Sequence, residues 1–371
     1  MAGIYIHIPF CAKRCIYCGF FSTVRQEEAA RYVRAVCREL KERKTYLDGA
    51  PVGTIYFGGG TPSRLTPGQI GDILNAISYT FGLDGVLELT VECNPDDITP
   101  QFISALRCLG VNRISMGVQT FNDAMLRFLH RRHTASQALD AVRICRESGI
   151  TNISIDLMYG LPGQTLELFL SDLETVLSAH VQHISSYCLS YEDNTPLQAL
   201  CDQGKLTPAT DELCSQMFTL MCDTLRSGGF EHYEISNFCR PGYHSRHNSS
   251  YWDGTPYLGV GAGSHSYNGT SRQWNPSDLD AYMTSIEQGT PQFEIEHLSA
   301  TDLYNEKLML SLRTVQGLNL STLSTLDRLS VLHSVQSLIS NGSLVLENNT
   351  LRIPESHMFI SDSIISTLFK D

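Results

Sequence analysis

Long apolar runs are absent from this chain of 371 residues: no window approaches the roughly 18 uninterrupted apolar residues of a membrane-spanning helix. Blocks of basic residues are absent as well, since 39 acidic residues outnumber 27 basic ones and the formal net charge is −12. A chain without a Lys/Arg cluster neutralises phosphates poorly, which disfavours general nucleic-acid binding and leaves only a local RNA site open. The N-terminal sequence MAGIYIHIPF lacks a basic leader and a small-residue cleavage site, so we expect no signal peptide.

The composition is otherwise that of an ordinary globular protein, with 42% hydrophobic and 18% charged residues. The length allows one large core plus a smaller domain. Twelve cysteines without an export signal indicate a reducing compartment rather than a disulfide scaffold. We therefore expect a cytoplasmic protein without a transmembrane segment, for which peripheral contact with a membrane surface stays open.

Short apolar stretches alternate with longer helical stretches over the first 230 residues, a pattern typical of a parallel sheet with crossover helices. The expected strands are residues 4–8, 52–57, 87–92, 113–119, 153–158 and 183–190. The expected helices are residues 27–44, 67–80, 100–109, a pair within 123–148, 166–178 and 210–228. Six such units predict an α/β fold with an incomplete barrel.

Polar or glycine-rich sequences follow five of these strands: CAKRCIYC, GGGTPS, ECNPD, GVQTFND and DLMYGLPGQT. In α/β barrels and open parallel sheets, the loops at the carboxyl ends of the strands build the active site. We therefore expect these five segments to converge on one mouth.

The first of these loops contains three cysteines, Cys11, Cys15 and Cys18. Thiolates are soft ligands that favour zinc or iron-sulfur clusters, and three of them on a cubane cluster leave one iron without a protein ligand. The position of the loop at a strand end favours an iron-sulfur cluster. The alternatives are structural zinc, with His7 or a distant cysteine as the fourth ligand, and three cysteines placed by chance.

The CxxxCxxC spacing resembles the cluster motif of the radical S-adenosylmethionine (SAM) superfamily. The resemblance implies that three thiolates hold a 4Fe-4S cluster, that the remaining iron binds the amine and carboxylate of SAM, and that one-electron reduction cleaves SAM to an adenosyl radical. It runs from Tyr5 to about Gly263 and includes IYIHIPFC, YFGGGTPS, ECNPD, RISMGVQTFND, DLMYGLPGQT and YEISNF. The expected fold is accordingly a radical SAM partial (β/α)6 barrel.

Several further residues match the SAM pocket of this superfamily. GGGTP looks like its GGE-type motif for the methionyl amine, although a tight strand-to-helix turn is the alternative. Polar residues at strand ends fit a barrel mouth, although caps and surface charges would explain each one singly, and packing would explain the tyrosines. The resemblance implies this set, without individual roles: Tyr5, Tyr17, Gly59, Gly60, Thr61, Glu92, Gln119, Arg131 and Asp156.

Within the superfamily, the motifs are similar to those of oxygen-independent coproporphyrinogen III oxidases and of HemW-type haem chaperones. The oxidases carry a further cysteine two residues after the triplet, where this chain has Phe20. They also have an N-terminal extension before the first strand, whereas ten residues precede Cys11 here. Both departures favour the chaperones.

A third feature is HNSSYW, which matches the HNxxYW motif associated with haem binding in HemW proteins. A neutral imidazole can bind haem iron axially, and aromatic rings can pack on the macrocycle. His247 is the expected ligand, while a surface or hydrogen-bonded histidine is the alternative. The implied haem-site residues are His247, Asn248, Tyr251 and Trp252, with His244 and His265 as weaker ligand candidates and Cys239 as a thiol that is either reactive or buried and inert.

Beyond about residue 231 the sequence becomes rich in aromatics, histidine and glycine, and we expect an irregular, functional segment. The last 70 or so residues contain helical patterns and a hairpin signal, LVLENNTLRI, which predict a small winged-helix-like α+β domain. Its candidate recognition segment, SVLHSVQSLISNG, has no lysine or arginine, so a docking or closing role is favoured over DNA binding. The expected domains are the radical SAM core at 1–230, an insert with the HNxxYW motif packing on that core at 231–295, and a C-terminal domain at 296–371.

The sequence therefore predicts a haem chaperone that binds a 4Fe-4S cluster, SAM and haem and delivers haem to a haem-accepting respiratory protein. The alternative is an active radical SAM enzyme, either a coproporphyrinogen III oxidase or an enzyme with another substrate. The cluster motif does not separate the two, because both need it.

Overall fold

Six parallel strands form the centre of the molecule in the computed structural model, which describes residues 1–370. Each strand pairs with the next one in the chain, and their apolar side chains are buried on both faces, as expected for a sheet covered by crossover helices. This confirms the six predicted strands within one or two residues at their ends. The strands are β1 (Ala2–Ile8), β2 (Val52–Gly59), β3 (Glu88–Cys93), β4 (Arg113–Gln119), β5 (Asn152–Tyr159) and β6 (His183–Cys188).

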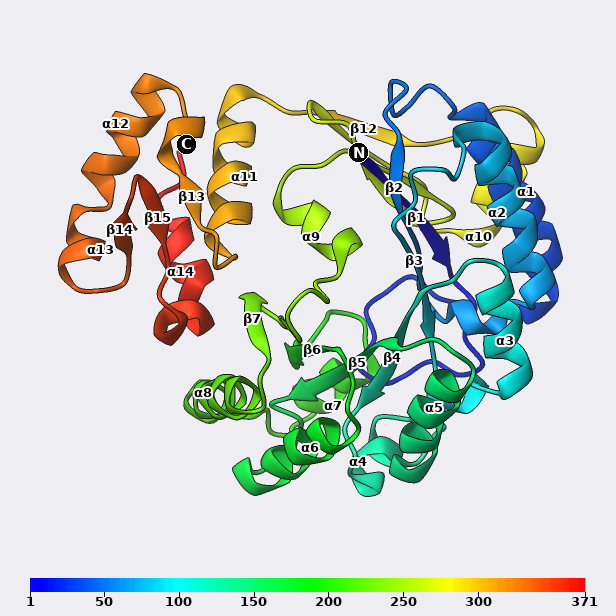
Figure 1. Ribbon diagram of the computed structural model, residues 1–371, viewed down its shortest axis with the longest axis horizontal. Coiled ribbons are helices and arrows are strands. Elements are labelled where there is room, and N and C mark those ends of the chain that lie inside the picture. Colours follow the sequence, from blue (N-terminus) through cyan, green and yellow to red (C-terminus); the bar gives the residue numbers. More distant parts are fainter. Residues whose placement is uncertain (371) are drawn as a thin grey trace.

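Helices join these strands and lie along their outer side (Figure 1). Six of them begin after a threonine whose side chain accepts a hydrogen bond from the backbone N–H three residues on, which satisfies one of the free donors at each helix start. The helices are α1 (Ala29–Glu42), α2 (Pro67–Phe81), α3 (Pro100–Cys108), α4 (Asp123–Phe128), α5 (Ala135–Glu147), α6 (Leu166–Ser178), α7 (Pro196–Asp202) and α8 (Asp211–Ser227).

The segment after residue 230 is more regular than the sequence indicated. It adds six short strands to the central sheet, which has the order β12-β11-β10-β9-β1-β2-β3-β4-β5-β6-β8-β7. Strands of three or four residues carry little periodicity, so their pairing with existing edges decides their conformation. The elements are β7 (Glu231–Glu234), β8 (Asn237–Cys239), α9 (Arg246–Trp252), β9 (Tyr257–Val260), β10 (His265–Tyr267), β11 (Ser271–Trp274), α10 (Leu279–Glu287) and β12 (Glu294–His297).

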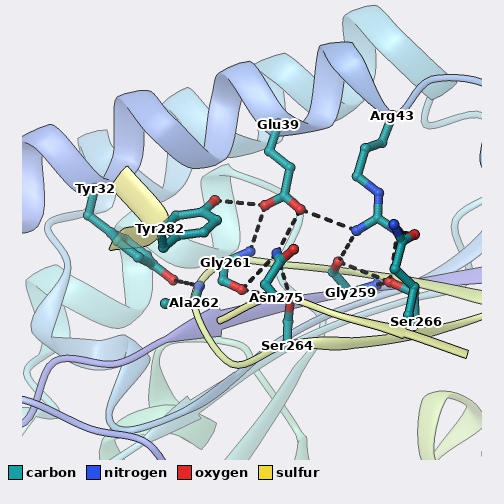
Figure 2. Close-up of polar contacts among 11 residues, drawn as sticks. Tyr32, Glu39, Arg43, Gly259, Gly261, Ala262, Ser264, Ser266, Asn275 and Tyr282 are labelled. Carbon is teal, nitrogen blue, oxygen red and sulfur yellow. Dashed lines mark hydrogen bonds and ion pairs between the residues drawn. The ribbon is translucent and has the colours of Figure 1, made fainter. Parts of the chain in front are cut away.

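A buried carboxylate fixes this added part of the sheet to α1 (Figure 2). Glu39, which is 2% exposed, accepts hydrogen bonds from the Gly261 N–H at 2.9 Å, the Tyr282 hydroxyl at 2.7 Å and the Asn275 amide at 2.8 Å. Arg43 pairs with the same carboxylate at 3.2 Å and donates to the Gly259 carbonyl at 3.0 Å. A buried charge with this many partners is satisfied, so the strands beyond β1 are held firmly against the helix.

The C-terminal unit has a hydrophobic cluster of its own, extending from Tyr304 to Leu368 (orange to red in Figure 1). Its three strands form a separate antiparallel sheet, and the predicted hairpin is confirmed: Asn348 and Asn349 both have positive φ. The elements are α11 (Ala300–Leu312), β13 (Leu318–Asn319), α12 (Thr325–Ser334), α13 (Gln336–Ser340), β14 (Val345–Glu347), β15 (Thr350–Arg352) and α14 (Ser361–Ser366). Within residues 1–370, no helix has the length and apolarity of a membrane span.

Candidate functional site

A cavity of about 660 Å³ opens at the carboxyl ends of the parallel strands. The five polar loops singled out in the sequence all contribute to it, because parallel strands end at the same edge of the sheet. Eleven of the predicted residues line it: Cys11, Cys15, Cys18, Tyr17, Gly59, Gly60, Thr61, Glu92, Gln119, Arg131 and Asp156.

The three cysteines lie on one side of this cavity, and all are half-buried and free of disulfides. Their loop is closed by Cys11, whose N–H donates to the Thr23 carbonyl at 2.8 Å. The Cys11 sulfur lies 3.4 Å from the Thr61 hydroxyl, and Arg131 donates to the Cys15 sulfur at 3.4 Å. Three free thiols facing one cavity, with donors directed at two of the sulfurs, fit an iron-sulfur cluster held by thiolates.

His7 does not offer the fourth ligand that a zinc site would need. Its Nδ1 hydrogen-bonds with the Tyr5 hydroxyl at 3.1 Å, and its Nε2 with the Phe21 carbonyl at 2.9 Å. His7 is 4% exposed, and its hydrogen bond to Phe21 supports the segment that follows the cysteine loop. The chemistry of the donor set therefore favours the cluster over zinc.

The glycines at the end of β2 allow its backbone to pass close to the residues just before the cysteine loop. Gly59 has a φ of 107°, and a Cβ there would lie 2.5 Å from the His7 ring. A Cβ on Gly60 would lie 2.8 Å from the Pro9 carbonyl group. Both positions thus require glycine for packing as well as for any approach to a ligand.

Arg131 brings a positive charge to the cysteine loop from another part of the chain. It comes from the segment between α4 and α5 and donates to the Asn94 amide oxygen at 2.7 Å and to the Gly117 carbonyl. Gln119 lies beside it at a bulge at the end of β4, with a φ of 73°. Backbone strain of this kind is concentrated at functional sites, and here it turns the Gln119 side chain toward the cavity.

Two half-buried carboxylates, Glu92 and Asp156, also line the cavity. The Glu92 carboxylate accepts hydrogen bonds from the Tyr56 hydroxyl at 2.7 Å and from the Gly59 N–H at 3.1 Å. Burial raises the pKa of Glu92 to about 7, against the effect of these donors. Burial also raises the pKa of Asp156 to about 6, although the Arg113 charge favours its ionised form. The two acids can therefore accept hydrogen bonds from hydroxyl or ammonium groups of a ligand.

Of the two predicted tyrosines, only Tyr17 lines the cavity. Tyr5 is not among the lining residues; its ring lies against Tyr56, and its hydroxyl supports His7. Sequence reasoning also missed Tyr56 and Asn94, which position Glu92 and Arg131. Asn94 lies inside the ECNPD motif and could have been identified from it, whereas Tyr56 in an apolar strand gave no signal.

The HNSSYW sequence forms α9, and its histidine is completely buried. His247 hydrogen-bonds with the Thr54 hydroxyl at 2.8 Å through Nδ1 and with the Tyr251 hydroxyl at 2.9 Å through Nε2. Its ring stacks on Tyr56 with centroids 5.0 Å apart. Burial lowers the pKa of His247 to about 3, so the ring is neutral. Neither nitrogen is free in this arrangement, and iron binding by His247 would require the hydrogen bond at the ligating nitrogen to break.

The other residues of HNSSYW and the weaker haem-ligand candidates lie on several elements. Asn248, Tyr251 and Trp252 are partly exposed on α9. The His244 Nε2 lies 3.8 Å from a Glu231 carboxylate oxygen. Cys239 is fully buried, and burial raises the pKa of its thiol to about 12, which fits the inert alternative. None of the predicted haem-site residues lines the 660 Å³ cavity.

The site belongs to a known class of proteins. The sequence model of the Radical SAM superfamily matches residues 5–176, which include the cysteine loop and strands β2 to β5. In a solved structure, the coproporphyrinogen III oxidase HemN from Escherichia coli has the same fold, with a TM-score of 0.86 and 23% identity over 100% of this chain and 90% of that one.

Relatives with similar sequences identify the family within this superfamily. The heme chaperone HemW of Mycobacterium tuberculosis is 32% identical over 99% of this chain and 94% of its own length. The heme chaperone HemW of Lactococcus lactis is 37% identical over 84% of this chain and 82% of its own length. The chain therefore belongs to the HemW heme chaperone family of the radical SAM superfamily.

Proposed function

We propose that this protein is a haem chaperone that carries a 4Fe-4S cluster and SAM and hands haem to a haem-requiring respiratory protein. The observation that carries the proposal is the family membership over almost the whole chain. Phe20 adds support, because it occupies the position of the additional cysteine of the oxidases and is 68% exposed at the rim of the cavity.

The cavity supports the first two cofactors. Cys11, Cys15 and Cys18 would hold the cluster, which supplies one-electron chemistry when bound. The backbone at Gly59 and Gly60 would pass beside the amino-acid end of SAM. The remaining pocket residues in this proposal are Tyr17, Thr61, Glu92, Gln119, Arg131 and Asp156. Tyr5 would act from outside the cavity, through His7.

For haem, we propose a site along α9 that includes Asn248, Tyr251 and Trp252, whose side chains are partly exposed. Axial ligation by His247 stays a prediction that needs α9 to rearrange, because both ring nitrogens are engaged. We also propose the division into a partial-barrel core at 1–230, a second part at 231–295 and a winged-helix-like domain at 296–371, and a cytoplasmic location. A protein of net charge −12 would reach an anionic membrane surface through a protein partner rather than by its own charge.

Anaerobic reconstitution tests the function directly. The cluster is rebuilt in the full chain, haem binding is followed by absorbance, and conversion of coproporphyrinogen III with SAM and a reductant is assayed in parallel. We expect stable haem binding and no porphyrinogen conversion. Conversion of porphyrinogen without stable haem binding would overturn the chaperone function in favour of the oxidase.

A further inference from the structure

Strands β10 and β11 present an exposed histidine on the face of the sheet opposite α1. His265 and Trp274 are paired directly across the two strands, so their side chains project from the same face. Their rings are stacked, with centroids 5.8 Å apart and planes 24° apart. Tyr267 and Arg272 form the next pair on this face.

The imidazole of His265 is available for a ligand. The residue is exposed, and within residues 1–370 neither of its ring nitrogens has a hydrogen-bond partner. Burial of part of the ring and the nearby Arg272 charge lower the pKa of His265, which favours the neutral form with a free lone pair. Among the histidines named by the sequence analysis, His247 has the opposite properties, being buried and hydrogen-bonded through both nitrogens.

The same face offers groups that match the other parts of a haem molecule. Trp274 stacks on the imidazole, which fixes the orientation of the His265 ring and places the apolar indole beside it. Arg272 is 38% exposed and pairs with Glu306 of α11 at 2.8 Å, so its guanidinium is positioned for a propionate carboxylate. An aromatic row continues from here to the HNxxYW motif through Tyr267, Tyr257 and Tyr251, with successive ring centroids 6.3 Å and 4.8 Å apart.

The opposite face of the two strands is fixed in place. Ser266 and Gln273 accept hydrogen bonds from Arg43 at 3.1 Å and 2.6 Å, within the Glu39 network of Figure 2. The loop before His265 packs on the segment that follows the cysteine loop, since a Cβ on Gly263 would lie 3.3 Å from the Phe21 Cβ. His265 thus stands on a rigid support beside the cluster loop, as a metal ligand requires.

We propose that His265 is the axial haem ligand of this protein, with Trp274 orienting the imidazole and Arg272 facing a propionate. This inference rests on the proposed haem-chaperone function. It extends the haem site from α9 along the aromatic row to β10 and β11, and it assigns His247 to the support of the sheet. The site lies next to Glu306 of the C-terminal unit, so that unit can cover the bound haem.

Titration of the full chain with haemin tests the assignment, with the Soret band as the reading and far-UV circular dichroism as the check on folding. We expect His265→Ala to bind haemin at least tenfold more weakly and to lose the wild-type Soret maximum, which free imidazole in the buffer then restores. Arg272→Gln should weaken binding severalfold with the Soret maximum unchanged, because it does not touch the iron. His297→Ala is the matched control: His297 is exposed on β12 but pairs with Ser271, so it projects from the opposite face.

His247→Gln separates the two candidate ligands, because glutamine keeps polar contacts in the buried position. We expect a folded variant with the wild-type Soret maximum. The assignment is overturned if His265→Ala retains the wild-type maximum and affinity, or if folded His247→Gln loses them; the chaperone function would survive either result. Failure of the wild-type chain to bind haemin would overturn the function and the assignment together.

Discussion

The cysteine loop and the HNSSYW segment both carry a recognisable motif, yet the fold treats them in opposite ways. The loop follows the carboxyl end of β1 and directs Cys11, Cys15 and Cys18 toward a cavity. The HNSSYW segment forms α9, which lies against β2 and buries His247 between Thr54 and Tyr251. One motif directs its metal-binding atoms into a cavity, and the other encloses them in hydrogen bonds within the protein.

This difference shows that a motif's spacing and the availability of its side chains are separate properties. The three sulfurs are close in the chain and share a loop at a strand end, so spacing alone brings them together. The environment of His247 comes from β1, β2 and α9, which are far apart in sequence. A histidine on one turn of helix can face the sheet or the solvent, and tertiary packing decides which.

Replacing Cys15 by serine should have the largest effect in this comparison. A cluster bound through three thiolates loses one of its anchors, and we expect iron retention to be abolished after reconstitution. Iron content and visible absorbance measure this, with Cys108→Ser as control because Cys108 is exposed on α3. A Cys15→Ser protein that keeps a full cluster would refute the cluster site.

The buried role of His247 predicts a loss of stability without any ligand. His247→Ala leaves the hydroxyls of Thr54 and Tyr251 without a buried partner and creates a void, so we expect the cofactor-free protein to lose about 3 kcal/mol of unfolding free energy. Urea unfolding followed by circular dichroism measures it. A change in the unfolding free energy of less than about 0.5 kcal/mol would mean that the His247 side chain does not form these buried hydrogen bonds.

Glu92 gives the cavity a pH signature opposite in sign to that of α9, where the lowered pKa of His247 reduces stability as the pH falls from 6.5 toward about 3. Burial raises its pKa from 4.5 to about 7, so the native state keeps a proton that the unfolded chain releases over this range. The unfolding free energy should therefore fall as the pH rises from 4.5 to 7, by at most about 3 kcal/mol for this residue. Glu92→Gln should flatten the decline, as seen in urea unfolding between pH 4.5 and 8. An unchanged slope would show that Glu92 ionises normally.

The smallest effect is expected at the rim. Phe20 is 68% exposed, so Phe20→Ser should change the unfolding free energy by less than about 0.5 kcal/mol and leave the iron content of the reconstituted protein unchanged. Thermal unfolding and iron analysis check both expectations. A larger loss would mean that Phe20 supports the cysteine loop rather than standing free beside it.

Much of the central fold was predictable, because strands buried on both faces alternate with threonine-capped helices and both signals are local. Glu92, Gln119 and Asp156 were expected at one mouth, since polar residues near the ends of parallel strands meet at one edge, and the family resemblance added Arg131, which lies between two helices. Strands β7 to β12 were not, because segments of three or four residues take their conformation from the edges they join. Tyr56 was missed because its partner, Glu92, lies on another strand.

The cysteine spacing, the order of strands and helices over the first 230 residues and the family all follow from the amino-acid sequence, since each depends on residues near one another in the chain or on similarity along its length. Which histidines are free, by contrast, depends on how the elements pack. His247 is enclosed because α9 packs on the sheet. His265 is exposed because the next residue on β10, Ser266, points to the opposite face, toward Arg43. The physical reason is that burial and hydrogen bonding depend on non-local neighbours, which a motif does not contain.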